Sequence, residues 1–345
     1  MMSRLDELLK TAYNLEASDI HLTVGSAPIF RIYGELQAQG NEKLLPHDTE
    51  EMAKSMLNDE LWEQFFEKRE LDFSYGITGI SRFRVNIYFQ RNCISLAIRV
   101  VPTKIPTLEE LKLPDTLKAI ADSAHGLVLV TGPTGSGKST TLAAMIDYMN
   151  TTKKKHIITL EDPIEYLHSH KECIIDQREV GFDTNNFQNG LRACLRQDPD
   201  VILVGEMRDI ETIATAITAA ETGHLVLGTL HTTDAASTMD RIIDVFPAEQ
   251  KGQIRIQLAN VLEAIISQRL FQTTDRHGRT AALEILRNTP AIKNLIRNEK
   301  MHQIPNAMQT SKSQGMQTMM MDVKRLLAEG SIQRDHALPY LKEGI

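Results

Sequence analysis

Cysteine is scarce in this sequence, and the few cysteines present lie far apart. The 345 residues include only Cys93, Cys173 and Cys194. An odd number of widely spaced cysteines argues against a disulfide framework, and no two of them have the CxxC spacing of a metal site. A chain without either feature is typical of a reducing compartment, so we expect a cytoplasmic protein.

Long apolar runs and an excess of positive charge are also lacking. No window approaches the 18 uninterrupted apolar residues of a membrane-spanning helix, and the first residues lack the basic start and apolar core of a signal peptide. Asp and Glu outnumber Lys and Arg by 45 to 38, for a net charge of −7. This balance argues against broad contacts to a nucleic-acid backbone. We therefore expect no transmembrane segment and no nucleic-acid partner.

A glycine-rich motif stands between a predicted strand and a predicted helix. Residues 132–139 match GxxxxGK[ST] at every fixed position, an apolar run at 127–130 precedes them, and apolar residues at helical spacing follow at 139–149. A glycine-rich turn can match by chance, but the flanking strand and helix favour a phosphate-binding loop. Its backbone N–H groups converge on phosphate oxygens, the lysine reaches the outer phosphates, and the serine hydroxyl binds Mg²⁺. The residues expected to bind the nucleotide are Gly132, Pro133, Thr134, Gly135, Ser136, Gly137, Lys138, Ser139 and Thr140.

Polar residues follow three further apolar segments that are typical of buried strands. Glu161 and His231 come directly after such a segment, and Glu206 follows one after a single glycine, Gly205. Strands alternating with helices predict a parallel sheet, and the carboxyl ends of parallel strands form one crevice. Glu206 has the position of a Walker B acid. Taken singly, Glu161 can also cap a helix and His231 can be a structural histidine, and the residues alone leave both alternatives open.

The first hundred residues have the pattern of a separate small α+β unit. Residues 81–88 alternate strictly, which places Arg82 and Arg84 on one face of a strand. Arg84 and Arg99 have two interpretations: a solvated sheet face, or arginines offered to the triphosphate of a neighbouring subunit. Several prolines then predict a linker. Towards the other end of the chain, we expect an amphipathic helix at 250–271 and further helices after it.

Four ordered motifs together resemble one family. They are GPTGSGKST at 132–140, IITLEDPIEY at 157–166, DPDVILVGEMRD at 198–209 and GHLVLGTLHTTD at 223–234. They look like the Walker A, Asp box, Walker B and His box of the secretion-ATPase superfamily, the hexameric motors of type II secretion and type IV pili. The tetracysteine zinc element of its extension and secretion motors is absent, so the chain most resembles the pilus-retraction branch. One departure is AIKNLIRN at 291–298, where retraction motors typically carry AIRNLIRE; lysine keeps the charge of arginine but loses its planar fork.

The resemblance implies an α/β fold and a domain organisation. We expect a PAS-like α+β domain at 1–101, a linker at 102–121, and a RecA-like P-loop NTPase domain with a C-terminal helical extension at 122–345. It further implies a homohexamer that hydrolyses ATP to ADP and phosphate to power type IV pilus retraction. The expected partner is the inner-membrane platform protein of the pilus machine, with the ring peripheral at the cytoplasmic face of the inner membrane. Related alternatives are a pilus-assembly, secretion or accessory retraction ATPase, and a more distant one is a RecA-like DNA translocase.

The resemblance also implies roles for particular residues. Ser139 and Glu206 would hold Mg²⁺, the latter partly through water. Either Glu206 or Glu161 would be the general base, and the resemblance does not separate the two. His231 would sense the γ-phosphate, and Arg84 and Arg99 would reach an active site as arginine fingers, which favours the functional interpretation of both arginines.

Overall fold

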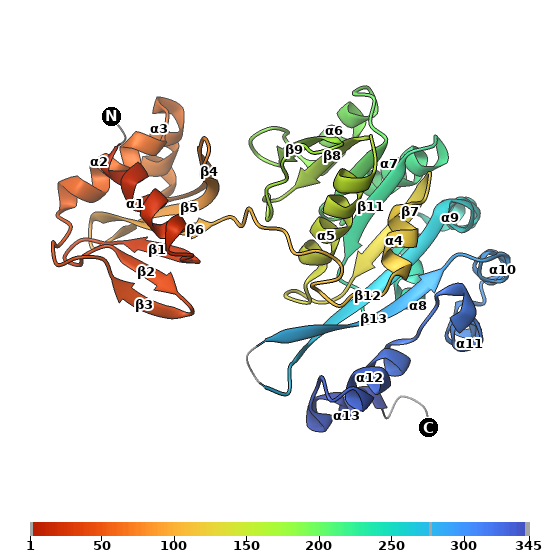
Figure 1. Ribbon diagram of the computed structural model, residues 1–345. Coiled ribbons are helices and arrows are strands. Elements are labelled where there is room, and N and C mark those ends of the chain that lie inside the picture. The colour runs from red at the N-terminus through yellow and green to blue at the C-terminus, as the bar shows by residue number, and fades with distance from the viewer. Residues whose placement is uncertain (1–2, 276–277, 342–345) are drawn as a thin grey trace. The chain divides into compact units, whose positions relative to one another are not determined.

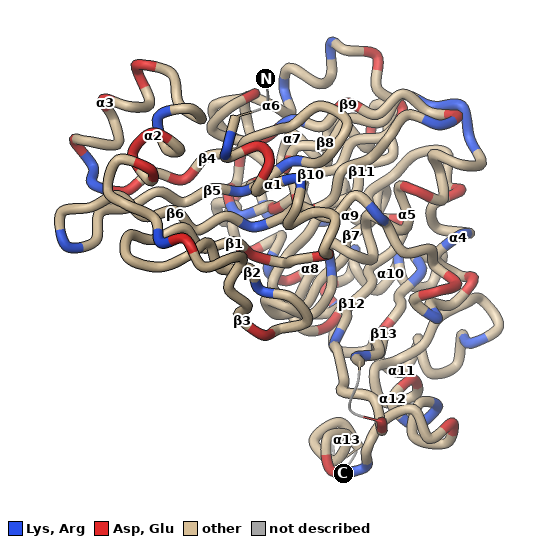
Figure 2. Tube along the Cα trace, turned by 60° about the vertical axis from the view of Figure 1, so that its left-hand side comes forward, with Lys and Arg blue, Asp and Glu red and all other residues tan. Residues whose placement is uncertain are grey.

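The chain folds into two compact units, Met1–Lys104 and Ile105–Ile345. The computed structural model describes residues 3–275 and 278–341, and its ribbon is drawn in Figure 1. Each unit has a sheet of its own. Charged residues of both signs are interspersed along both units (Figure 2). No helix of the described residues is long and apolar enough to cross a bilayer.

The first unit is a six-stranded antiparallel sheet with helices packed on one of its faces. The strand order is β3-β2-β1-β6-β5-β4, and helices α1, α2 and α3 lie on the same side of the sheet (Figure 1). The elements are α1 (Arg4–Asn14), β1 (Asp19–Leu22), β2 (Ile29–Ile32), β3 (Glu35–Ala38), α2 (Pro46–Met56), α3 (Asp59–Lys68), β4 (Glu70–Ile77), β5 (Ser81–Gln90) and β6 (Cys93–Val100).

Alternation along the strands builds this unit. In β5, Phe83, Val85 and Ile87 are buried, whereas the residues between them are partly exposed. The buried side chains join Leu9 of α1 and Phe65 of α3 in one apolar core. Because successive side chains of a strand point to opposite faces, the arginines of β5 lie on the face away from this core, as the sequence predicts.

The second unit is a mixed, mainly parallel sheet with helices on both faces. Its seven strands run in the order β13-β12-β7-β11-β10-β8-β9, and only β13 is antiparallel to its neighbour. The strands are β7 (Gly126–Thr131), β8 (His156–Glu161), β9 (Ile174–Glu179), β10 (Val201–Val204), β11 (Leu225–Leu230), β12 (Leu262–Gln272) and β13 (Arg279–Arg287). The helices are α4 (Thr116–Ala121), α5 (Lys138–Thr152), α6 (Phe187–Cys194), α7 (Ile210–Glu221), α8 (Ala235–Asp244), α9 (Ala248–Val261), α10 (Pro290–Arg297), α11 (Ile304–Thr310), α12 (Met319–Ala328) and α13 (Arg334–Leu341).

Strand β7 shows how the two faces are filled. Leu127 and Leu129 enter the core beneath α6 to α9, whereas Val128 and Val130 enter the core beneath α4 and α5. A strand covered on both faces is apolar throughout. The expected α/β class is therefore confirmed.

The helix expected at 250–271 is wrong in its second half. Helix α9 ends at Val261 and strand β12 begins at Leu262, where it pairs in parallel with β7. Most of β12 is buried. Such a strand has no apolar–polar alternation, so its sequence pattern does not distinguish it from a buried helix.

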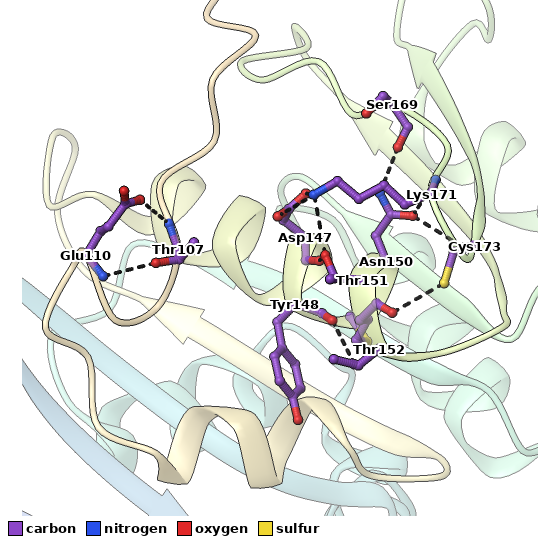
Figure 3. A network of polar contacts seen from close by, with 11 residues as sticks. Thr107, Glu110, Asp147, Tyr148, Asn150, Thr151, Thr152, Ser169, Lys171 and Cys173 are labelled. Atoms are coloured by element: carbon purple, nitrogen blue, oxygen red, sulfur yellow. Dashed lines mark hydrogen bonds and ion pairs between the residues drawn. The ribbon is translucent and has the colours of Figure 1, made fainter.

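The segment expected as a linker, 102–121, is mostly part of the second unit. From Ile105 onwards it belongs to that unit, and Leu108, Leu117 and Ile120 are buried in the core beneath α5. A turn starts it: the Thr107 N–H donates to the Glu110 carboxylate at 2.8 Å, and the Glu110 N–H donates to the Thr107 hydroxyl at 3.1 Å (Figure 3). The prolines that suggested a linker stand between apolar residues that pack onto the sheet.

Candidate nucleotide-binding site

A pocket of about 440 Å³ lies at the carboxyl ends of the central strands of the second unit. It is lined by the loop between β7 and α5, and by residues that follow β8, β10 and β11. These four strands are consecutive in the sheet, in the order β7-β11-β10-β8. The phosphate loop and the acidic and histidine residues therefore come together because parallel strands end at one edge.

The glycines of the phosphate loop allow backbone conformations and contacts that other residues do not. Gly132 and Gly137 have φ angles of 144° and 88°. A Cβ at Gly132 would lie 2.4 Å from the backbone oxygen of Gln268. Helix α5 begins at Lys138, directly after the loop, without a side-chain cap on its first N–H groups. Such uncapped N–H groups and the helix dipole make an anion site.

Lys138 lies folded against the loop that precedes it. Its ammonium donates to the backbone oxygens of Gly132 at 2.8 Å and Pro133 at 3.2 Å. Partial burial lowers the pKa of Lys138, although the charges of Glu206 and Glu165 act in the opposite direction. A partly buried cation is attracted strongly by phosphate oxygens that enter the pocket, because the charges there are less screened by water.

Glu206 and His231 contact one another across the neighbouring strand ends. The His231 ring nitrogen Nε2 lies 2.9 Å from the Glu206 carboxylate, which also pairs with Arg208. Burial acts to raise the pKa of Glu206, but Arg208 and His231 outweigh it and hold that pKa below its usual value. Glu206 is therefore an ionised carboxylate, which suits a hard cation that prefers oxygen ligands, such as Mg²⁺.

Glu161 has a different environment at the end of β8. Its carboxylate accepts hydrogen bonds from the Thr159 hydroxyl at 2.7 Å and the Gln177 amide at 3.1 Å. Burial raises the pKa of Glu161. The segment after it is a loop, so Glu161 caps no helix in the structure. A carboxylate with a raised pKa is the kind that accepts a proton at neutral pH.

Residues outside the predicted set also line the pocket. The Tyr166 hydroxyl lies 2.9 Å from the Thr140 hydroxyl, and His168 lines the wall beside it. Burial lowers the pKa of His168 to about 4, so this ring is neutral at physiological pH. Leu270 and Arg279 line the pocket from the β12–β13 hairpin. Tyr166 stands in the IITLEDPIEY motif and was within reach of sequence reasoning, whereas Leu270 and Arg279 belong to no motif.

The loop that carries Tyr166 and His168 is tied to α5. Asn150 is buried; its amide donates to the Ser169 backbone oxygen at 2.7 Å and its oxygen accepts from the Lys171 N–H at 3.1 Å (Figure 3). The same oxygen accepts from the Cys173 N–H at 3.4 Å. A buried side-chain amide that bonds three backbone groups of one segment holds that segment in one position.

Arg84 and Arg99 lie on the first unit, opposite one another on β5 and β6. Arg99 donates to the Asp19 carboxylate at 2.9 Å, and Asp19 is also the register partner of Arg31 on β2. Directly opposed like charges repel, and the Asp19 carboxylate offsets this repulsion on the Arg99 side of the pair. The remaining predicted residues, Glu161, Glu206, His231 and the phosphate loop, all lie on the second unit.

The chain matches known proteins along almost its whole length. Residues 1–337 match the family model described as type II/IV secretion system protein. The chain is 50% identical to the type IV pilus retraction ATPase PilT of Pseudomonas aeruginosa, covering 96% of each chain. It is 47% identical to a twitching motility protein of Neisseria gonorrhoeae, covering 94% of this chain and 88% of that one. The crystal structure of the pilus retraction motor PilT with bound ADP matches with a TM-score of 0.89 at 48% identity, over 98% of this chain and 97% of that one.

The fold, the pocket and these matches define one class of protein. The chain belongs to the family of type II/IV secretion system proteins. Within that family it is a PilT-like ATPase of type IV pilus retraction.

Proposed function

We propose that this chain hydrolyses ATP to ADP and phosphate and uses the energy to withdraw a type IV pilus. The observation that carries the proposal is the meeting of a phosphate loop, two carboxylates of opposite pKa behaviour and a histidine in one pocket. Phosphoryl transfer needs positioning and charge stabilisation more than covalent chemistry, and these groups provide both.

Within the pocket, the two glutamates take different roles. Glu161, with its raised pKa and no cationic partner in its contacts, is the general base for the attacking water. Glu206, held ionised by Arg208, serves the cation side of the site. Lys138 and the loop N–H groups hold the β- and γ-phosphates, and His231 contacts the γ-phosphate from the β11 end. Sequence motifs alone leave the glutamates interchangeable, and the proposed division of roles rests on their different surroundings.

The pocket suits Mg²⁺ together with the nucleotide. Its oxygen donors, the Ser139 hydroxyl and the Glu206 carboxylate, are the kind that Mg²⁺ prefers. Among residues 3–275 and 278–341, no group of three or more His, Cys, Asp or Glu could hold a metal alone. When bound, Mg²⁺ neutralises charge that develops on the phosphates.

Charge from the first unit completes the site in a homohexamer. Arg84 and Arg99 act as arginine fingers that stabilise the transition state. We assign the first unit as PAS-like and the second as RecA-like with a C-terminal helical extension. The second unit then begins at Ile105, earlier than the boundary expected from the sequence. Loss of the γ-phosphate removes the contacts made by Lys138, His231 and an arginine, which is a two-state switch. Around a ring at the cytoplasmic face of the inner membrane, this switch drives the platform protein of the pilus machine.

Retraction and assembly make opposite predictions for cells. Deleting the gene in a piliated host should leave cells hyperpiliated and without twitching motility, because pili still extend but are not withdrawn. Electron microscopy of surface pili with a twitching assay measures this, and restoration by the wild-type gene is the control. Bald cells would instead assign the chain to assembly. Normal pilus number and motility would assign it to an accessory role, and hydrolysis stimulated by DNA would revive the translocase alternative.

A further inference from the structure

Gln268 on strand β12 connects the two ends of the nucleotide-binding turn. Its side chain is buried, with 2% exposed. The amide nitrogen Nε2 donates to the Ser136 backbone oxygen at 2.7 Å, and the amide oxygen accepts from the Thr141 hydroxyl at 2.7 Å. One bond therefore ends in the phosphate loop and the other in the first turn of α5, on either side of Lys138.

The orientation of this amide follows from its partners. A backbone carbonyl accepts hydrogen bonds but never donates them, so the group that faces Ser136 must be the NH₂ end of Gln268. The Thr141 hydroxyl can then donate to the other end. If the amide were flipped, its oxygen would face the Ser136 carbonyl oxygen, and the hydrogen bond there would be lost.

The loop backbone also packs directly against Gln268. A Cβ on Gly132 would come within 2.4 Å of the Gln268 backbone oxygen, and a Cβ on Gly137 within 2.7 Å of its Nε2. Both fixed glycines of the motif thus contact the same residue of β12. Gln268 itself is not among the residues that line the pocket, so it acts on the nucleotide only through the loop.

Peptide geometry turns this contact into an effect on ligand binding. In a trans peptide unit the C=O and the following N–H point in opposite directions. Gln268 holds the Ser136 oxygen on the β12 side, and the Gly137 N–H of the same peptide unit is thereby directed away from β12, towards the pocket that Gly137 lines. Backbone N–H groups aimed in this way are what bind phosphate.

We propose that Gln268 is a positioning residue that sets the Ser136–Gly137 peptide for phosphate binding. This inference rests on the proposed function of the pocket, since it concerns how the same loop binds its nucleotide. It assigns a role in ATP binding to a strand that carries none of the recognised motifs.

Gln268→Met tests the proposal because it keeps volume and removes both hydrogen bonds. We expect ADP binding by the full chain to weaken about tenfold or more, since the loop peptide is no longer held. The KM for ATP should rise by a similar factor while kcat changes by less than about threefold, because the contact serves ground state and transition state alike. Gln268→Glu should weaken ADP binding further, since a carboxylate cannot donate to the Ser136 oxygen.

Ser267→Ala is the matched control. Ser267 precedes Gln268 in β12 and is also buried. Its hydroxyl accepts a hydrogen bond from the Thr131 hydroxyl at 2.9 Å, and this bond joins β12 to strand β7 rather than to the loop. The substitution should lower the unfolding temperature and leave ADP affinity within about twofold. Should Gln268→Met fail to fold, Thr141→Val removes one of the two bonds and should weaken ADP binding by a smaller factor.

The outcomes separate this inference from the proposed function. Wild-type affinity for ADP in Gln268→Met, or in Thr141→Val if that variant is used, overturns the positioning role and leaves the proposed function standing. Equal losses of affinity in Gln268→Met and Ser267→Ala also overturn it, because they would reflect general destabilisation. Failure of the wild-type chain itself to bind ADP would contradict the proposed function instead.

Discussion

Replacing Lys138 with alanine is expected to lower ATP turnover by about a hundredfold or more, because the cation that clamps the transferring phosphate is lost. The Lys138 ammonium is partly buried and lies against the loop backbone, where phosphate oxygens can replace the Gly132 and Pro133 oxygens as its partners. Phosphate release by the purified full chain measures the effect, and a thermal unfolding curve shows whether the variant is folded.

Lys171→Ala is the control for this loss. Lys171 is also a lysine of the second unit and pairs with Asp147 of α5 at 2.7 Å, but neither residue lines the pocket (Figure 3). Its removal should leave turnover near the wild-type value. Unchanged turnover in a folded Lys138→Ala variant would mean that hydrolysis occurs elsewhere and that the active site is misassigned.

Replacing Arg84 with alanine should reduce turnover by about a thousandfold while nucleotide binding persists, which is the behaviour of an arginine finger. Arg84 faces Arg99 across β5 and β6, and of the two, only Arg99 pairs with a carboxylate of the described residues, that of Asp19. Removing Arg84 should not disturb the fold, since its side chain lies on the face of the sheet away from the core. Turnover and ADP affinity measured on one preparation separate catalysis from binding.

Arg91→Ala controls for the loss of a positive charge in the same unit. Arg91 is exposed at the turn between β5 and β6, at the opposite end of those strands. It should retain turnover. Full hydrolysis by Arg84→Ala would mean that Arg84 is not an arginine finger but a solvated arginine on a sheet face.

Much of the site could be predicted because its residues follow strands in a recognisable order. Glu161, Glu206 and His231 lie far apart along the chain, yet parallel pairing of β8, β10 and β11 places them at one edge beside the loop after β7. The strand ends were visible in the sequence as apolar segments followed by polar residues.

The contribution of β12 and β13 could not be predicted. Gln268 and Leu270 stand in a strand that is buried on both faces, so its pattern resembled the end of a helix. The partners of Gln268 lie 132 and 127 residues earlier in the chain. Local patterns contain no information about such distant pairings. The different surroundings of Glu161 and Glu206, on which their proposed roles rest, likewise include neighbours that are distant in the chain, Gln177 and His231.

We propose that the loop, Glu206 and His231 together hold the terminal phosphate of ATP. A structure of the full chain with Mg²⁺ and a non-hydrolysable ATP analogue tests it most directly. We expect a γ-phosphate within hydrogen-bonding reach of both Lys138 and His231, with Glu206 facing the metal ion. An analogue bound away from the loop, or a Glu206 and a His231 turned out of the pocket that Lys138 lines, would contradict it.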